Sequence, residues 1–161
     1  MDKRLGILLC IVFMAACQPA YDTRQYIDYP SGWPKDQAAL FDFQLTDEGP
    51  RQLYLHLRNS NDYPFSNIFL ISQLKSPEGL IVQDTLEYAM TDAQGAWLGK
   101  GAFDLKESRL WWLEKAELPV GVPLQIYIRQ AVRQNGEQHG LDTLPGIVSV
   151  GFSVEPVLKD N

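Results

Sequence analysis

The chain has 161 residues, with 14 Lys and Arg against 20 Asp and Glu, which gives a formal net charge of −6 at pH 7. This acidic balance argues against nucleic acid as a partner and against electrostatic adhesion to anionic lipid. With 45% hydrophobic and 21% charged residues, the chain can bury a core and has the size of one domain.

The N-terminus has the pattern of an export signal. A short basic start precedes an apolar run over residues 5–14, too short for a membrane-spanning helix, which needs about 20 residues. Two small residues then lead to Cys17, and the tetrapeptide at 14–17 resembles the bacterial lipobox. We expect residues 1–16 to be cleaved as a signal peptide and Cys17 to carry two or three acyl chains, which together anchor a protein firmly to a membrane.

The alternative is an ordinary cleaved signal that leaves Cys17 as a free thiol. The chain has 2 cysteines, and Cys10 leaves with the signal peptide. Cys17 therefore has no disulfide partner within the mature chain, which favours lipidation.

Residues 17–37 contain three prolines and no sustained hydrophobic period. This composition predicts a flexible, lipidated tether rather than a structural element. A coil of about 20 residues averages roughly 25 Å between its ends, enough to lift a domain off the membrane surface.

The remainder of the chain, 38–161, alternates apolar and polar residues as strands with one wet face do. The alternation is clearest at 41–46, 53–58, 124–129 and 148–154, and the continuous apolar run at 67–74 is typical of a strand covered on both faces. Turn-forming residues break these segments at intervals of about 12 residues. We expect an all-β fold: a single β-sandwich domain, jelly-roll-like, after the signal peptide and the tether.

Residues 104–115 are the one segment with some helical periodicity, and a short helix there is left open. If the segment is extended instead, the adjacent Trp111 and Trp112 face opposite ways and one of them can reach solvent. An exposed tryptophan can stack on a sugar ring or anchor a protein interface, although core packing is the favoured interpretation for both.

The sequence contains no nucleophile elbow, phosphate-binding glycine loop or zinc-protease motif. We therefore expect no enzyme, no cofactor and no metal site. His56 and His139 are interpreted as surface residues rather than as a shared zinc site. The acidic residues near turns are interpreted as turn-stabilising rather than catalytic; they are Asp42, Asp62, Asp84, Glu87, Asp92 and Asp104.

Several blocks in order resemble one family. They are RNSNDYPFSNIFL at 58–70, DTLEY at 84–88, WLGKG at 97–101, KES at 106–108, IRQAVR at 128–133 and LPGIVSVG at 144–151. Together they resemble the gliding-motility lipoprotein GldH family of Bacteroidetes, over nearly the whole mature chain. The lipobox also lies where that family carries it.

The resemblance implies a cell-envelope lipoprotein associated with gliding over surfaces and functionally tied to type IX secretion. It implies no established catalytic activity or ligand. We therefore expect a non-enzymatic accessory or adaptor, anchored to the membrane by its lipid, that binds other envelope proteins of this machinery. A carbohydrate- or peptidoglycan-binding sandwich, motivated by the fold class and the tryptophans, is the alternative.

The block at 58–70 has two interpretations. Asn61 and Asp62 can form side-chain-to-backbone bonds that mimic turns, and Tyr63 and Phe65 can plug the end of the sandwich. This scaffold role is favoured, and the competing hypothesis makes the same loop a docking surface for an envelope protein.

The segment after Cys17 begins QPAYD and lacks the acidic run that resembles a surface-export signal in this phylum. This favours the periplasmic face, and we expect the anchor to lie in the outer membrane.

Overall fold

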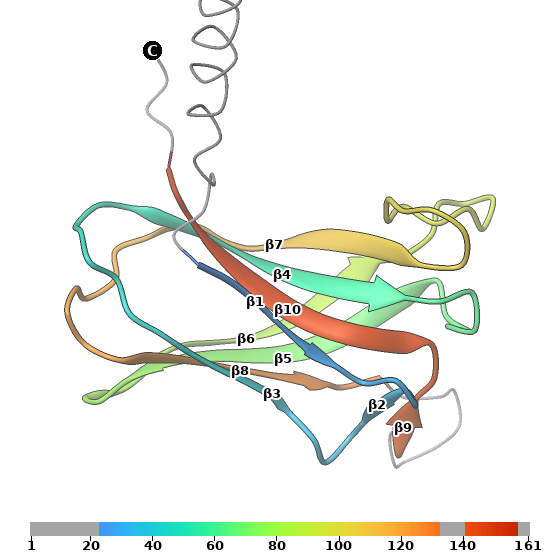
Figure 1. Cartoon of the computed structure of the whole chain (residues 1–161), viewed down its shortest axis with the longest axis horizontal. Coiled ribbons are helices and arrows are strands. Elements are labelled where there is room, and N and C mark those ends of the chain that lie inside the picture. The colour runs from blue at the N-terminus through green and yellow to red at the C-terminus, as the bar shows by residue number, and fades with distance from the viewer. Residues whose placement is uncertain (1–22, 133–140, 158–161) are drawn as a thin grey trace, which may run out of the picture.

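The computed structural model describes residues 23–132 and 141–157, and within these ranges every regular element is a strand. Two four-stranded antiparallel sheets pack face to face (Figure 1). In spatial order, sheet I consists of β1 (Thr23–Asp28), β10 (Ile147–Pro156), β4 (Arg51–Asn59) and β7 (Lys106–Ala116). Sheet II consists of β3 (Ala39–Phe43), β8 (Leu124–Gln130), β5 (Asn67–Ser76) and β6 (Gly79–Ala89). The expected all-β sandwich is confirmed.

The core lies between the sheets because each strand turns alternate side chains inward. Leu53, Leu55 and Leu57 of β4 are fully buried, as are Ile126 and Ile128 of β8 on the facing sheet. β5 has an alternating burial pattern rather than the even burial predicted at 67–74, so its outer face is only half covered. The described residues include no helix suited to crossing a bilayer.

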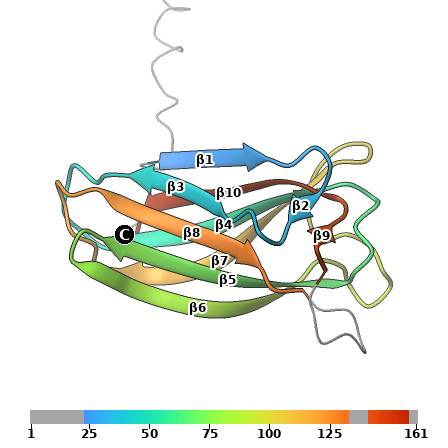
Figure 2. The ribbon, with the colours of Figure 1, turned by 90° about the horizontal axis from the view of Figure 1, so that it is seen from below.

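The sandwich starts at Thr23, so the tether predicted over 17–37 is wrong for most of its length. β1 pairs with β10 over its full length, from Thr23 opposite Val154 to Asp28 opposite Ser149. Further on, β2 (Trp33–Pro34) pairs with β9 (Thr143–Leu144) at one end of the sandwich (Figure 2). The sequence prediction failed because β1 is an edge strand whose residues are only partly buried and show no apolar alternation.

Trp33, assigned by the sequence to the tether, is fully buried in the core, and its Nε1 donates to the Gln37 carbonyl at 2.7 Å. Of the predicted tether only residues 17–22 precede the first strand, and these lie outside the described residues, as Cys17 and His139 do.

The segment over 104–115 is extended from Lys106 onward as β7, after a turn that includes Asp104, and the helical alternative is not adopted. β7 and β6 are the edge strands on one side of the sandwich, and two side-chain bonds join them. The Tyr88 hydroxyl donates to the Trp111 carbonyl at 2.5 Å, and Trp112 Nε1 donates to Asp84 Oδ2 at 2.8 Å. The two sheets are therefore tied together along this side as well as through the core.

Candidate functional site

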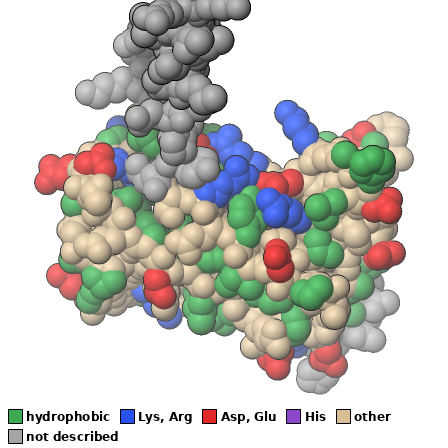
Figure 3. Space-filling model, viewed as in Figure 1, with side chains coloured by type: hydrophobic (Ala, Val, Ile, Leu, Met, Phe, Trp, Pro, Cys, Tyr) green, Lys and Arg blue, Asp and Glu red, His purple; other side chains and the backbone are tan. Residues whose placement is uncertain are grey.

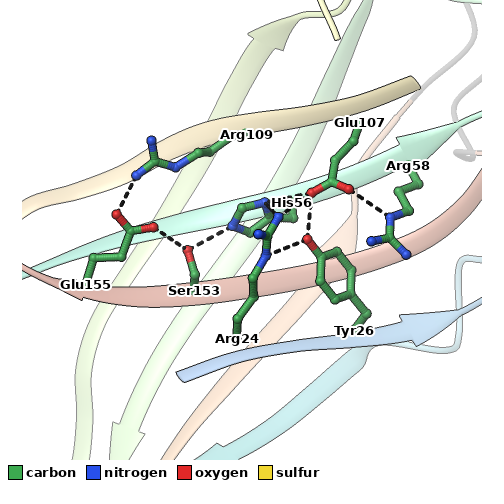
Figure 4. A network of polar contacts seen from close by, with 8 residues as sticks. All are labelled: Arg24, Tyr26, His56, Arg58, Glu107, Arg109, Ser153 and Glu155. Carbon is green, nitrogen blue, oxygen red and sulfur yellow. Dashed lines mark hydrogen bonds and ion pairs between the residues drawn. The ribbon is translucent and has the colours of Figure 1, made fainter. Parts of the chain in front are cut away.

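The outer face of sheet I carries a network of charged and polar side chains drawn from all four strands (Figure 4). Strand register places them in transverse rows: Tyr26, Gly151, His56 and Arg109 are successive partners across β1, β10, β4 and β7. Because side chains on one face of a sheet alternate with those on the other, these residues all point away from the core.

Glu107 of β7 is the centre of this network. Its Oε1 accepts hydrogen bonds from Arg24 Nη2 at 2.5 Å and from the Tyr26 hydroxyl at 2.6 Å, and its Oε2 accepts from Arg58 Nε at 2.9 Å. Burial alone raises the pKa of the Glu107 carboxyl, but the bonds from Tyr26 and Arg58 and the two guanidinium charges outweigh it and lower the pKa to about 2. Glu107 is therefore a fixed anion that links edge strand β7 to edge strand β1.

The absence of a side chain at Gly151 lets Tyr26 reach Glu107. A Cβ at Gly151 would lie 2.5 Å from Tyr26 Cδ1, so the ring occupies the space above β10. The Arg58 guanidinium packs over the Tyr26 ring, with its central carbon 4.2 Å from the ring centroid. Burial and the bond to Glu107 raise the pKa of Tyr26 to about 12, so its hydroxyl remains a donor.

His56 is buried, with 1% of its surface exposed, so its interpretation as a surface histidine is wrong. Its Nε2 lies 2.8 Å from Ser153 Oγ, and the Ser153 hydroxyl donates to Glu155 at 3.1 Å. On the other side of the His56 ring, Nδ1 lies 3.4 Å from both Arg24 Nη2 and Glu107 Oε1. Burial and the Arg24 charge lower the pKa of His56 to about 4, which keeps this ring neutral.

The same face ends in an aromatic and basic group at β7. Arg109 Nη2 pairs with Glu155 at 2.6 Å, and its guanidinium carbon lies 3.6 Å from the Tyr54 ring centroid. The Trp111 ring meets Tyr54 edge-on at 4.9 Å and is 45% exposed. A groove runs beside this group along β7, and its lining includes Leu98, Lys100 and Trp111.

Trp111 and Trp112 face opposite ways, as expected for an extended segment. Trp112 points into the sandwich with 7% exposure, so its indole has almost no surface to offer a ligand. Trp111 is thus the member of the pair that a partner can reach.

The loop of the 58–70 block lies at the end of sheet I where β4 ends and β7 begins. Tyr63 is 3% exposed, belongs to the core and donates its hydroxyl to the Asn67 carbonyl at 2.7 Å. Asn61 and Asp62 are exposed. Asn61 joins this loop to the loop over 90–105, because its oxygen accepts from Trp97 Nε1 at 3.1 Å and its amide donates to Asp104 at 3.0 Å.

These bonds support the scaffold interpretation of the loop. Ser60 Oγ accepts the Asp62 amide proton at 3.2 Å, and Phe65 packs against the core beside Tyr63. Gly146, at a φ of 75°, approaches so closely that a Cβ there would lie 2.2 Å from the Tyr63 nitrogen.

Within 23–132 and 141–157, no three His, Cys, Asp or Glu side chains converge as a metal site would require. Among the acidic residues interpreted as turn-stabilising, Asp92 does accept the amide protons of Gln94 and Ala96, each at 2.9 Å. Asp84 and Asp104 instead accept from side chains of other elements.

Sequence reasoning missed Arg24, Tyr26 and Glu107 as members of one site. The signal was present in part, because Glu107, Arg109 and Trp111 alternate with buried residues along β7. It could not be used, since the segment was also compatible with a helix and β1 was assigned to the tether.

A sequence model of the family described as GldH lipoprotein matches residues 21–154 of the chain. A protein of Christiangramia forsetii named "Gliding motility lipoprotein GldH homolog" is 38% identical over 151 residues, covering 92% of this chain and 91% of that protein. "Gliding motility lipoprotein GldH" of Flavobacterium johnsoniae is 36% identical over 155 residues, covering 95% of this chain and 96% of that protein.

Among solved structures, dimeric latent PorU from Porphyromonas gingivalis is similar at 12% identity with a TM-score of 0.35, covering 88% of this chain and 14% of that one. Likeness at this level carries no functional argument. The sequence matches do support an assignment, because their identity is much higher and they span nearly the full length of both relatives. The chain belongs to the GldH lipoprotein family.

Proposed function

We propose that this chain is a non-enzymatic adaptor of the gliding-motility machinery, tied to type IX secretion and held at the periplasmic face of the outer membrane by acyl chains on Cys17. The names of its two relatives support the part in gliding motility and the lipid anchor. The adaptor acts by presenting a protein-binding surface at a fixed place in the envelope.

The observation that carries the adaptor role is the outer face of sheet II. Leu40, Tyr127, Gln73 and Gln83 form one row across its four strands. Leu40 is 50% exposed, while Tyr127 and Gln73 are half-buried. This central row mixes apolar and neutral polar side chains, and the charged residues of the face, Asp42, Lys75, Glu87 and Arg129, lie in other rows. Charges that are sparse near the centre are typical of a protein interface.

Photocrosslinking from this face tests the adaptor role. A benzophenone amino acid in place of Gln83, exposed on β6, is expected to give a discrete high-mass adduct with an envelope protein in living cells. The matched control replaces Gln37, an exposed glutamine in the loop before β3. Equal adduct patterns from both positions, or none from Gln83, would overturn docking on sheet II.

The anchor has its own test. Cys17→Ser is expected to abolish metabolic labelling by an alkyne fatty acid and to release the protein from the membrane fraction. Labelling that persists would refute lipidation of Cys17. Protease treatment of intact cells checks the side of the membrane, because digestion before the outer membrane is broken would exclude the periplasmic face.

A glycan-binding function is the second candidate, and the exposed Trp111 beside Tyr54 and Arg109 supports it. An indole next to polar side chains can stack on a sugar ring. Envelope glycans would then quench tryptophan fluorescence in the wild type and leave Trp111→Ala unaffected. A flat titration across a broad glycan panel would end this candidate.

A further inference from the structure

Apolar side chains project from the loop between β6 and β7, beside the outer face of sheet I. Phe103 is 94% exposed, and Leu98 and Leu105 are 55% and 45% exposed. Phe103 also has a φ of 53°, a left-handed conformation that is unfavourable for a bulky residue. Lys106 Nζ donates to the Phe103 carbonyl at 2.9 Å and so helps to hold the backbone in this conformation. The loop is thus built to hold an aromatic ring in solvent.

Basic side chains lie beside these apolar ones, and Figure 3 shows Lys and Arg along the upper side of the molecule next to apolar groups. The basic residues of sheet I and this loop are Arg24, Arg51, Arg58, Lys100, Lys106, Arg109 and Lys115, against the acidic Asp28, Asp92, Asp104, Glu107, Glu114 and Glu155. Arg51 is buried, so six basic and six acidic residues leave the exposed part of this surface close to neutral in a chain of net charge −6. An anionic surface therefore repels it less than it repels the rest of the molecule.

The connection to the anchor limits where this surface can be. Only residues 18–22 separate Cys17 from Thr23, the first residue of β1, and even fully extended they reach roughly 20 Å. β1 is an edge strand of sheet I. Sheet I is therefore the sheet tied to the anchor, and the bilayer is within reach of its outer face.

We propose that the outer face of sheet I and the loop over 98–106 lie against the bilayer that holds the Cys17 acyl chains. Phe103 enters the headgroup region with Leu98 and Leu105, and Trp111 lies at the interface, where tryptophan is favoured. Lys100 and Arg109, which line the groove beside β7, contact lipid phosphates. The short connection supplies a high local concentration, so weak contacts suffice to orient the domain.

This inference rests on the proposed lipid anchor and adds an orientation. With sheet I on the bilayer, sheet II faces the opposite way, because the two sheets are the two layers of one sandwich (Figure 1). The face proposed to bind a partner is then directed into the periplasm.

An environment-sensitive probe tests the orientation in the full lipoprotein, reconstituted in protein-free vesicles of phosphatidylethanolamine and phosphatidylglycerol. Once Cys17 is acylated, an introduced cysteine is the single free thiol of the mature chain. An NBD label on Ala102→Cys, next to Phe103, is expected to shift its emission to shorter wavelength and to be quenched by nitroxide lipids. The same label on Thr85→Cys, exposed on β6 of sheet II, is expected to emit as in water.

Adding Phe103→Ser to the Ala102→Cys protein is expected to reverse much of that shift. Identical emission from positions 102 and 85 would overturn the orientation. A shift at 102 that occurs in native outer membranes but not in protein-free vesicles would also overturn it, and would assign the loop to a protein partner. Failure of the wild type to stay with the vesicles at all would remove the anchor itself, and this inference with it.

Discussion

Gly151 shows how one residue without a side chain allows the polar network of sheet I to form. The Tyr26 ring lies over β10 only because no Cβ is present there, and from this position its hydroxyl reaches Glu107. The sequence placed Gly151 inside a strand, where glycine often marks a close approach by another group. It could not identify that group, because β1 was assigned to the tether.

Gly151→Ala is expected to lower the free energy of unfolding by about 1–3 kcal/mol, the usual cost of overpacking. The new Cβ would lie 2.5 Å from both the Gln25 carbonyl oxygen and the Tyr26 ring, so β1 must move. Urea unfolding followed by tryptophan fluorescence measures the change. Ser149→Ala on the same strand is the control, since the buried Ser149 hydroxyl has no partner within the described chain. Equal stability of Gly151→Ala and the wild type would contradict this packing.

His56 gives the fold a defined pH dependence. Its pKa falls from 6.5 to about 4 on folding, so between these pH values the unfolded chain binds a proton that the folded chain does not. Stability that is present above pH 6.5 is therefore lost as the pH falls toward 4, by at most about 3 kcal/mol. Glu107, with its lowered pKa, adds a further loss mainly below pH 4.5.

The measurement is the free energy of unfolding at pH 7 and pH 4.5, for the wild type and for His56→Gln. The wild type is expected to lose more stability over this interval than the variant, whatever their difference at pH 7. Parallel pH profiles would show that His56 is not held neutral by the fold.

At the scale of elements, Glu107 fastens the strand next to the anchor. β1 is an edge strand that pairs with β10 alone, and the bonds from Arg24 and Tyr26 to Glu107 tie it across the sheet to β7. Since only five residues lie between Cys17 and β1, any pull on the lipid anchor acts first on this strand.

Glu107→Gln is expected to cost about 2 kcal/mol, as charge-assisted hydrogen bonds are lost, and to loosen β1 selectively. Hydrogen exchange resolved by strand should be faster in residues 23–28 of the variant than in the same residues of the wild type. Exchange in β4 and β8 should be the same in both proteins. Glu114→Gln, on an exposed residue of the same strand, is the control and should leave β1 unchanged. Uniform loss of protection across both sheets would contradict a local fastening role.

The sequence predicted strands with an apolar alternation well and missed β1, for one physical reason. β3, β4 and β8 bury alternate leucine, isoleucine and phenylalanine side chains, so their period of two is visible. β1 is stabilised by a polar network across the sheet, which leaves no apolar alternation to detect. β7 alternates too, but Leu110 and Leu113 are also three residues apart, a spacing that fits one face of a helix.

At the scale of the whole molecule, the structure shortens the link between lipid and domain. The sequence predicted a tether of about 20 residues, whereas the first strand starts at Thr23. A domain so close to its anchor has a restricted orientation. In the account proposed here, sheet I rests on the bilayer and sheet II presents its mixed face to a partner.

Part of this site could be predicted. The sequence singled out Asn61, Asp62 and Tyr63, and the structure places them in a loop tied to the core and to the loop over 90–105, while a partner-binding role for them stays a prediction. For Trp111 and Trp112 the favoured prediction of core packing holds for Trp112, while Trp111 is 45% exposed, as the alternative of an extended segment implied. The sequence could not predict that β1, β4 and β7 converge on Glu107, because that convergence depends on strand order.

The most direct measurement compares how fast a water-soluble maleimide labels Gln83→Cys on sheet II and Ala102→Cys beside Phe103. We expect slow labelling of both cysteines in native outer membranes, where lipid covers position 102 and a partner covers position 83. In protein-free vesicles we expect slow labelling at 102 and fast labelling at 83, and in detergent we expect fast labelling of both. Equally fast labelling of position 83 in native membranes and in protein-free vesicles would contradict the adaptor role.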